Sequence, residues 1–456
     1  MSLIGVLLFL GGMVTAPESI YVLDSNAPVW DVATEDLNQD GILDVLTVCC
    51  DKDRDPLEKY VAVFLEAPSQ GYPPSPSSVF ELNTEVGGLF LAETDGKAPK
   101  ELVTVHASGA AVYGFENGKW TPQSSIQFSS LFPTNAREPL FLRDAATDLD
   151  GDGIDEWFVP IAGGFQIFCA EKPLVTINCD IESEIRRGEN MYIYHRLPTY
   201  HTFTVPDAPQ KAIAFLSDEY ADFAYGEQWQ QHNRFKIPLR VDEKWDASVR
   251  MADVDKNGLP DLIVTQTKGT VNLLALTQVY LAKAPYQYAD TPDVTYETKG
   301  ALASPFLKDV NGDNLDDLVF IKIPLGVRAF MNYFLRRKLT VEVDVHFYKP
   351  SGYGAAPDFT QTLTLDAPEG REQVAYTMGD FNGDKRLDVA IGAGTGGMVV
   401  YTGVAGKFLN QKPWVTVDIP SFGIARAIDL DKNGKDDIIL FHPGVANKNK
   451  IEIVLF

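Results

Sequence analysis

Basic residues are scarce in this chain of 456 residues. Lys and Arg total 39 against 63 Asp and Glu, which gives a formal net charge of −24. Nucleic-acid binding needs clustered Lys and Arg to meet the phosphates, so this balance argues against a nucleic-acid partner. Apolar residues are not scarce. They make up 45% of the chain, which is normal for a globular protein and excludes a disordered one.

Histidines are also few, and the six present do not form a recognisable catalytic arrangement. No two lie at the helical spacing of a zinc motif, and neither a nucleophile elbow nor a phosphate-binding loop occurs. Residues 392–397 match a dinucleotide fingerprint, but strand-like residues follow them, so we interpret them as a β-turn. His195, Tyr200 and His201, in the insert after the third repeat unit, are the best catalytic candidates. The simpler interpretation is that they are exposed loop residues.

Four cysteines neither establish nor exclude an oxidising compartment. Cys169 and Cys179 are ten positions apart and could face each other across a hairpin. Cys49 and Cys50 are adjacent at the end of a predicted strand, so their side chains point to opposite faces. For this second pair we favour buried free thiols.

Long apolar runs are missing except for a short one at the amino terminus. Residues 3–14 are apolar apart from glycines, whereas a membrane-spanning helix needs about 20 residues. The run fits a secretory signal with small residues at 14–16, so we predict a signal peptide over 1–16 and an extracellular, periplasmic or cell-surface protein. No basic residue precedes the run, and Pro17 would follow the cut. A buried N-terminal strand is the alternative.

The sequence does contain a short acidic motif that recurs along its length. The motif reads Asp-x-Asp/Asn-x-Asp/Asn, usually with Gly near the middle, and has an acid at the ninth place before an apolar run. The six clear copies occupy residues 36–44, 148–156, 253–261, 309–317, 380–388 and 429–437. Residues 93–101 form a degenerate copy with Lys97 at the fifth place. We assign another, with a shortened loop, around Asp222.

The interval between ninth-place acids averages about 56 residues, which favours propeller blades over a helical solenoid. Short β-branched runs such as Val45–Val48 and Ile438–Leu440 follow the loops and read as buried strands. We therefore predict an all-β fold, a single β-propeller of seven or eight four-stranded blades over 17–456, with eight favoured. Inserts are expected near 174–210 and 325–371.

The last repeat unit contains only three strands, which predicts how the ring closes. Residues 19–23 near the amino terminus read as a further strand and would complete the unit. Pairing of the two chain ends removes sheet edges that would otherwise be exposed.

The loops have the composition of cation sites. Carboxylates at places one, three, five and nine, with a backbone carbonyl at place seven, form a cage of hard oxygen ligands of the kind that calcium prefers. The spacing resembles the start of an EF-hand loop, but the acid falls at place nine and a strand follows. The predicted metal ligands are Asp36, Asn38, Asp40, Ile42, Asp44, Asp148, Asp150, Asp152, Ile154, Glu156, Asp253, Asp255, Asn257, Leu259, Asp261, Asp309, Asn311, Asp313, Leu315, Asp317, Asp380, Asn382, Asp384, Arg386, Asp388, Asp429, Asp431, Asn433, Lys435 and Asp437.

Up to six structural calcium ions follow from this assignment. Polar turns without metal are the alternative interpretation. The loop at 93–101 should bind poorly because Lys97 places an ammonium group where a ligand belongs, and the unit around Asp222 should bind nothing.

The six loops resemble the FG-GAP/VCBS repeat family, whose calcium-loop propellers include the head of integrin α subunits. Phe422-Gly423 before the last loop is similar to the integrin-like pattern, and residues 391–394 are similar to its Gly-Ala-Pro ending. Most units lack these ends, so the looser VCBS-type branch is the closer match. The resemblance covers residues 24–456. It implies a seven- or eight-bladed, exported or cell-surface propeller that binds protein or carbohydrate.

We therefore expect a non-catalytic binding or scaffold module, monomeric, with an unidentified protein or glycan ligand. Some relatives in the family are enzymes, so the alternative is an extracellular polysaccharide-acting enzyme such as a lyase. A lyase should have a basic cleft with Lys or Arg among aromatic residues. In this sequence the basic residues are scattered.

Overall fold

Thirty-seven strands and one 3₁₀ helix, η1 (Glu227–Trp229), form the regular structure of the described residues. The computed structural model describes residues 17–51, 57–134, 138–187, 191–206, 208–239, 245–269, 274–299, 305–322, 337–366, 372–394, 396–443 and 448–456. The predicted all-β class is confirmed.

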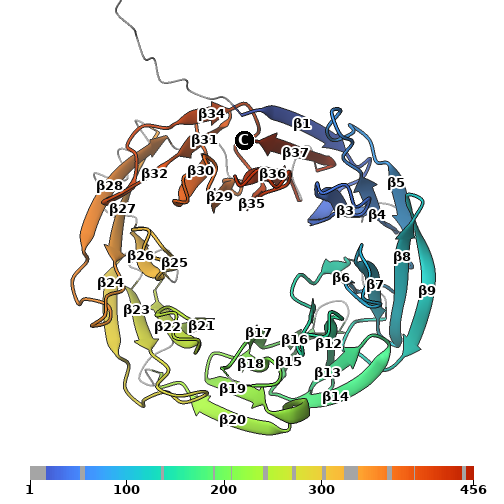
Figure 1. Cartoon of the computed structure of the whole chain (residues 1–456), viewed down its shortest axis with the longest axis horizontal. Helices are drawn as coiled ribbons and strands as arrows, with labels where there is room; N and C mark the ends of the chain where they lie inside the picture. Colours follow the sequence, from blue (N-terminus) through green and yellow to red (C-terminus); the bar gives the residue numbers. More distant parts are fainter. Residues whose placement is uncertain are drawn as a thin grey trace, which may run out of the picture.

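The strands form eight blades arranged around a ring (Figure 1). Seven blades have four strands, and the second blade along the chain has five, because an added strand pairs with its first strand. In the four-stranded blades the first strand lies nearest the centre and the fourth lies on the outside (Figure 1). The fold is therefore an eight-bladed β-propeller.

The first four blades follow the chain in order. Blade 1 contains β2 (Val29–Glu35), β3 (Asp44–Asp51), β4 (Glu58–Phe64) and β5 (Ser78–Glu81). Blade 2 contains β6 (Gly88–Ala92), β7 (Glu101–His106), β8 (Gly109–Glu116), β9 (Lys119–Gln127) and the added strand β10 (Leu140–Phe141). Blade 3 contains β11 (Ala146–Thr147), β12 (Glu156–Ile161), β13 (Gly164–Cys169) and β14 (Lys172–Asn178). Blade 4 contains β17 (Thr199–Phe203), β18 (Ala212–Leu216), β19 (Tyr220–Tyr225) and β20 (Gln231–Lys236).

The remaining blades complete the ring. Blade 5 contains β21 (Asp246–Ala252), β22 (Asp261–Lys268), β23 (Leu274–Tyr280) and β24 (Val294–Lys299). Blade 6 contains β25 (Phe306–Lys308), β26 (Asp317–Lys322), β27 (Lys338–His346) and β28 (Phe359–Asp366). Blade 7 contains β29 (Tyr376–Gly379), β30 (Asp388–Gly392), β31 (Met398–Tyr401) and β34 (Val415–Val417). Blade 8 contains β35 (Ile424–Ile428), β36 (Asp437–Phe441), β37 (Lys450–Leu455) and β1 (Ser19–Asp24).

Two small hairpins lie outside this scheme. One joins β15 (Glu182–Arg187) to β16 (Met191–Arg196) between blades 3 and 4, and the other joins β32 (Gly403–Val404) to β33 (Lys407–Leu409) in blade 7. The range 174–210 thus holds this first hairpin together with blade strands β14 and β17. In the range 325–371, the described residues form β27 and β28. Residues 347–358 connect these two strands, and residues 325–336 and 367–371 lie outside the described residues, as does the predicted signal peptide at 1–16.

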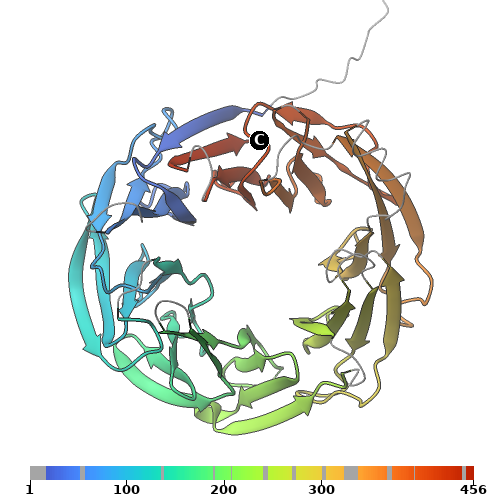
Figure 2. The ribbon, with the colours of Figure 1, turned by 180° about the vertical axis from the view of Figure 1, so that it is seen from behind.

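The ring closes by pairing of the two chain ends, as predicted. β1 lies antiparallel to β37, from Ser19 opposite Leu455 to Asp24 opposite Lys450, and the two lie side by side in both views (Figure 1, Figure 2). Leu23 is fully buried and packs into the core between blades 8 and 1, whereas the side chain of Val22 is 52% exposed. β1 thus supplies both the outermost hydrogen bonds of blade 8 and part of its core.

The hydrophobic core is divided among the blade interfaces. Eight clusters of buried side chains occur, each formed by two consecutive blades, and the cluster centred on Leu23 and Phe441 joins the last blade to the first. Second strands such as β3, β18 and β36 are buried along almost their whole length because neighbouring blades cover both of their faces. This explains the continuous apolar runs after the acidic loops.

The hairpin β13–β14 corrects one expectation about the cysteines. Cys169 pairs with Lys172 at the turn, while Gly164 pairs with Asn178 at the opposite end, so Cys169 and Cys179 lie at opposite ends of the hairpin. None of the four cysteines forms a disulfide bond. Cys49 and Cys50 are both buried in β3, as expected.

Candidate metal centres

Each acidic loop connects the first and second strands of a blade, and its ninth residue is the first residue of the second strand. The side chain at this place is therefore buried between the neighbouring blades. Glu101 of the degenerate loop is 4% exposed, and those of the six clear loops are 0% exposed: Asp44, Glu156, Asp261, Asp317, Asp388 and Asp437.

Places four and six of all six clear loops have a left-handed backbone. Each loop has glycine at one of these places at least, as the sequence predicts. Five of the twelve positions nevertheless carry other residues: Gln39, Lys256, Asn314, Lys385 and Lys432. A left-handed conformation costs a non-glycine residue about 1–2 kcal/mol. The loops therefore keep one tight conformation at some cost in stability, a feature often found at functional sites.

The backbone N–H groups of each loop point at its own carboxylates. In blade 5, Asp253 accepts hydrogen bonds from the N–H groups of Asn257 and Gly258, both at 3.0 Å. The side chain of Asn257 accepts one from Leu259 at 2.7 Å. The bonds from place six to place one and from place seven to place five recur in all six loops. The side chains are thus held on the inside of the turn.

The ninth-place carboxylate joins the loop to the rest of the blade. One of its oxygens accepts the N–H of place two at 2.7–3.1 Å in all seven loops. Where the ninth residue is Asp, the other oxygen accepts an N–H at 2.7–3.1 Å from a residue just after the third strand, namely Glu66, Ala282, Tyr348, Gly403 or Phe456.

The two loops that end in Glu differ. In blades 2 and 3 the third and fourth strands are joined by two-residue turns, at 117–118 and 170–171, in place of a longer connection. Glu156 accepts the N–H of Leu149 through Oε2 at 2.7 Å, but its buried Oε1 accepts no N–H or O–H hydrogen bond from the described residues. The Cys169 thiol, a weak donor, lies beside this carboxyl group and opposes part of the rise in its pKa. A buried carboxylate oxygen without a partner is costly, and a bound cation would remove that cost.

Carboxylates at places one, three and nine converge in four loops. Their ligand atoms lie within 4.8 Å of one another in the sets Glu93, Asp95 and Glu101; Asp148, Asp150 and Glu156; Asp253, Asp255 and Asp261; and Asp429, Asp431 and Asp437. The other three clear loops carry Asn at place three and so have one carboxylate fewer. An all-oxygen donor set fits calcium or magnesium. Place five is Lys97, Asp152, Asn257 and Asn433 in these four loops, so it adds a carboxylate only in blade 3.

Burial raises the pKa of the ninth-place acids, and the other carboxylates of the loop add to this effect. The pKa rises to about 6 for Asp44 and Asp317, and to about 7 for Glu156, Asp261, Asp388 and Asp437. Hydrogen bonds from backbone N–H groups oppose the rise but do not cancel it. Each site therefore disfavours its own negative charge, a cost that a divalent cation would offset.

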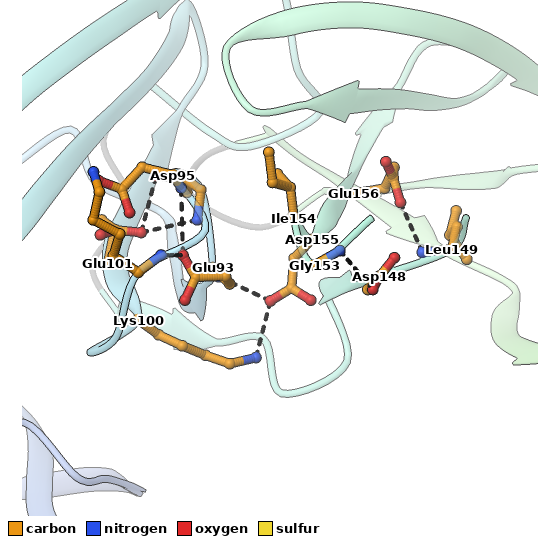
Figure 3. A network of polar contacts seen from close by, with 12 residues as sticks. Glu93, Asp95, Lys100, Glu101, Asp148, Leu149, Gly153, Ile154, Asp155 and Glu156 are labelled. Atoms are coloured by element: carbon orange, nitrogen blue, oxygen red, sulfur yellow. Dashed lines mark hydrogen bonds and ion pairs between the residues drawn. The ribbon is translucent and has the colours of Figure 1, made fainter. Parts of the chain in front are cut away.

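Loops of adjacent blades also contact each other through place eight, which the sequence did not single out. Figure 3 shows this contact between blades 2 and 3, where Asp155 accepts bonds from the Glu93 N–H at 2.8 Å and from the Lys100 ammonium at 2.9 Å. Main-chain bonds from place eight recur between other neighbours: Leu43 to Leu430, Lys211 to Leu149, Asp316 to Val254, and Asp436 to Asp380. The loops thus link blades laterally.

Blade 4 requires a correction. Asp222 lies inside β19, the third strand, and forms an ion pair with Arg234 at 2.6 Å. The equivalent loop of blade 4 is residues 204–211, and Ala212 occupies the ninth place. The assignment to Asp222 was wrong because this loop has no acid at places one, three, five or nine, so the motif could not reveal it. With Ala212 in place of Asp222, the intervals on either side become 56 and 49 residues, close to the others.

Glu66 is an acid near the first loop that the repeat pattern missed. Its side chain is 8% exposed, and its Oε2 is buried without a partner among the described residues. Burial raises the pKa of this carboxyl group, with a further contribution from Asp40. Glu66 is a candidate additional oxygen donor for the first loop. It lies after the third strand, outside the nine-residue motif, so no local pattern could reveal it.

The catalytic candidates do not form a site. Tyr200 and His201 lie on β17, the first strand of blade 4, and not in an insert loop. The Tyr200 hydroxyl donates to the Asp144 carbonyl at 2.7 Å, and its ring stacks on Phe158 with centroids 4.4 Å apart. His195 lies on the separate hairpin strand β16, beside Ser183. These contacts give Tyr200 a packing role.

Comparison with known proteins does not assign this chain to a family. No family profile matches the sequence, and no curated protein matches it. Solved structures with overall similarity include BBS1N in complex with ARL6DN (10% identity, 97% of each chain covered, TM-score 0.38) and the WD40 domain of SCAP from fission yeast (9% identity, 96% and 94% covered, TM-score 0.41). A third is the V. cholerae biofilm matrix protein Bap1 (11% identity, 95% and 88% covered, TM-score 0.33). Among the described residues, no helix has the length and apolar character needed to span a membrane.

Proposed function

We propose that this chain is an exported, calcium-stabilised β-propeller of the FG-GAP/VCBS type that serves as a non-catalytic binding or scaffold module for a protein or a carbohydrate. The observation that carries the cation assignment is the blade 3 loop. There, ligand atoms of Asp148, Asp150 and Glu156 lie within 4.8 Å of one another, and a buried oxygen of Glu156 accepts no N–H or O–H hydrogen bond from the described residues.

In this proposal the side chains at places one, three, five and nine and the backbone carbonyl at place seven hold the ion, and calcium would supply positive charge there. The chain itself holds the ligands in place. The N–H groups of places five to seven bind the loop side chains, and the ninth-place acid connects the ion to the start of the second strand. A rigid loop face of this kind suits binding because its surface is already ordered before a partner arrives.

Export is proposed from the short apolar run at residues 3–14. β1 starts at Ser19, so removal of residues 1–16 would leave the closing strand intact. The expected mature protein starts at Pro17 and is found outside the cytoplasm. Intact-mass analysis of secreted material tests this, and a cytoplasmic protein that retains residues 1–16 would contradict it.

The binding role is tested by screening the purified protein against protein and glycan arrays, with and without calcium. The proposal expects at least one reproducible ligand and no turnover. Incubation with acidic polysaccharides serves as the counter-test, because the release of unsaturated products would identify a lyase instead.

A further inference from the structure

A polar cavity lies between blades 5 and 6, beside one of the acidic loops. Its volume is about 510 Å³, which is within the range of small-molecule sites. One wall is the loop after β21, with Asp255 and Asn257 facing the cavity. The other walls are the connection between β23 and β24 and the connection between β27 and β28.

The cavity walls mix hydroxyl-binding groups with an aromatic surface. Asp255, Asn257 and Asp293 offer acceptors, and Lys283 offers donors. The half-buried ring of Tyr348 lies among them and packs against Tyr353 in a T-shaped arrangement, with centroids 4.9 Å apart and ring planes at 88°. A ligand with many hydroxyl groups and an apolar C–H face matches such a lining.

The charges at the cavity select against an anionic occupant. Lys283 is already paired with Asp293, with Nζ and Oδ1 2.7 Å apart. Asp255 contributes a further negative charge, and the hydroxyl of Tyr348 lies 3.4 Å from its Oδ2. Even with one calcium ion bound, the three carboxylates of Asp253, Asp255 and Asp261 outweigh its two positive charges, so an acidic sugar would meet a net negative site and a neutral sugar would not.

The walls of the cavity are fixed by the loop framework. The N–H of Ala282 donates to Asp261 at 2.8 Å, and the N–H of Tyr348 donates to Asp317 at 3.1 Å, so both walls are attached to ninth-place carboxylates. The Tyr353 hydroxyl donates to the carbonyl of Asp316 at 2.5 Å. A cavity ordered in this way loses little conformational entropy when a ligand binds.

We propose that this cavity is a binding site for a neutral sugar residue, which stacks on Tyr348 and bonds to Asp255, Asn257 and Lys283. The inference rests on the proposed binding function and specifies its ligand class. Asp255 belongs both to the cavity and to the carboxylate set of its loop. Calcium in that loop would order the Asp255 side chain and strengthen sugar binding.

The test measures binding of fluorescently labelled neutral disaccharides of glucose, galactose, mannose and N-acetylglucosamine, with digalacturonate as the acidic probe. We expect the calcium-loaded protein to bind at least one neutral probe and not digalacturonate. Tyr348→Ala and Lys283→Ala should each weaken binding at least tenfold. Tyr376→Ala, which removes an exposed tyrosine in blade 7, should leave it unchanged.

Circular dichroism and melting of each variant show whether it has folded, and the exposed position of Lys283 keeps one variant informative if Tyr348→Ala unfolds. Binding of a neutral probe that neither substitution weakens would overturn the cavity assignment while leaving the proposed binding function intact. Binding of digalacturonate alone would overturn the ligand class. A protein that binds calcium and a protein ligand but no neutral probe would overturn this inference alone.

Discussion

The buried carboxylate of Asp437 provides a test of why the ninth place is acidic. It is fully buried, accepts N–H bonds from Leu430 and Phe456, and has a pKa raised from 3.8 to about 7 by burial. That difference corresponds to at most about 4 kcal/mol in favour of the neutral group. In the absence of metal, the ionised carboxylate therefore destabilises the fold.

Asp437→Asn should separate the two roles of this side chain. At pH 8 without metal, the variant should melt at the same temperature as the parent or higher, by up to about 4 K for a chain that unfolds with about 1 kcal/mol per kelvin. Its calcium-induced stabilisation should fall by about 3 kcal/mol, the value of one site occupied at 100 times its Kd.

Differential scanning calorimetry of metal-stripped and calcium-loaded samples makes the measurement. Asp418→Asn, at an exposed carboxylate, is the matched control. It should change the free energy of unfolding by no more than about 0.5 kcal/mol, with or without calcium. The reasoning fails if Asp437→Asn lowers the metal-free melting temperature by several kelvin and leaves the calcium shift intact. Such a result would make the carboxylate a hydrogen-bond acceptor only.

Three further predictions follow from particular residues. First, the metal-free protein should lose stability as the pH rises from about 4 to about 7. The folded pKa values of Glu156, Asp261, Asp388 and Asp437 lie above the unfolded ones, so the folded state binds more protons in that window. Calcium should abolish this loss of stability. If the free energy of unfolding depends on pH in the same way with and without calcium, the prediction is wrong. Second, Leu23→Ala should cost about 2–5 kcal/mol in urea unfolding by weakening ring closure, whereas Val22→Ala on the exposed face should cost under about 0.5 kcal/mol. Equal effects would mean that β1 does not pack as described. Third, Lys97→Asp should add one calcium ion by native mass spectrometry, because Glu93, Asp95 and Glu101 already converge and Lys97 pairs with Asp95 at 3.1 Å. An unchanged ion count would show that this loop lacks more than its fifth ligand.

The fold was predictable from sequence where the information is local. Nine consecutive residues specify the loop, and the apolar run after it specifies a strand covered on both faces. The spare strand at 19–23 followed from counting strands in the last unit. Counting the units favoured eight blades over seven, although the unit of blade 4 was placed at Asp222 in place of Ala212.

The errors and omissions arise where the information is not local. Blade 4 keeps the loop frame through the main-chain bond from Lys211 to Leu149, but it has Ala212 where the others have an acid, so the search for acids moved to Asp222. Glu66 comes from a different strand connection. The sequence also showed Glu in place of Asp at the ninth place of two loops, without revealing why. The structure shows that these are the two blades whose third and fourth strands are joined by short turns, at 117–118 and 170–171.

If the recurring acidic loops are calcium sites that stabilise the ring, calcium uptake and thermal stability must rise together. Native mass spectrometry of the metal-stripped protein titrated with calcium, paired with its melting curve at each step, measures both. We expect discrete binding of up to six ions, with a melting temperature that rises as they bind. A protein that takes up no calcium beyond non-specific adducts, and melts at the same temperature throughout the titration, would contradict it.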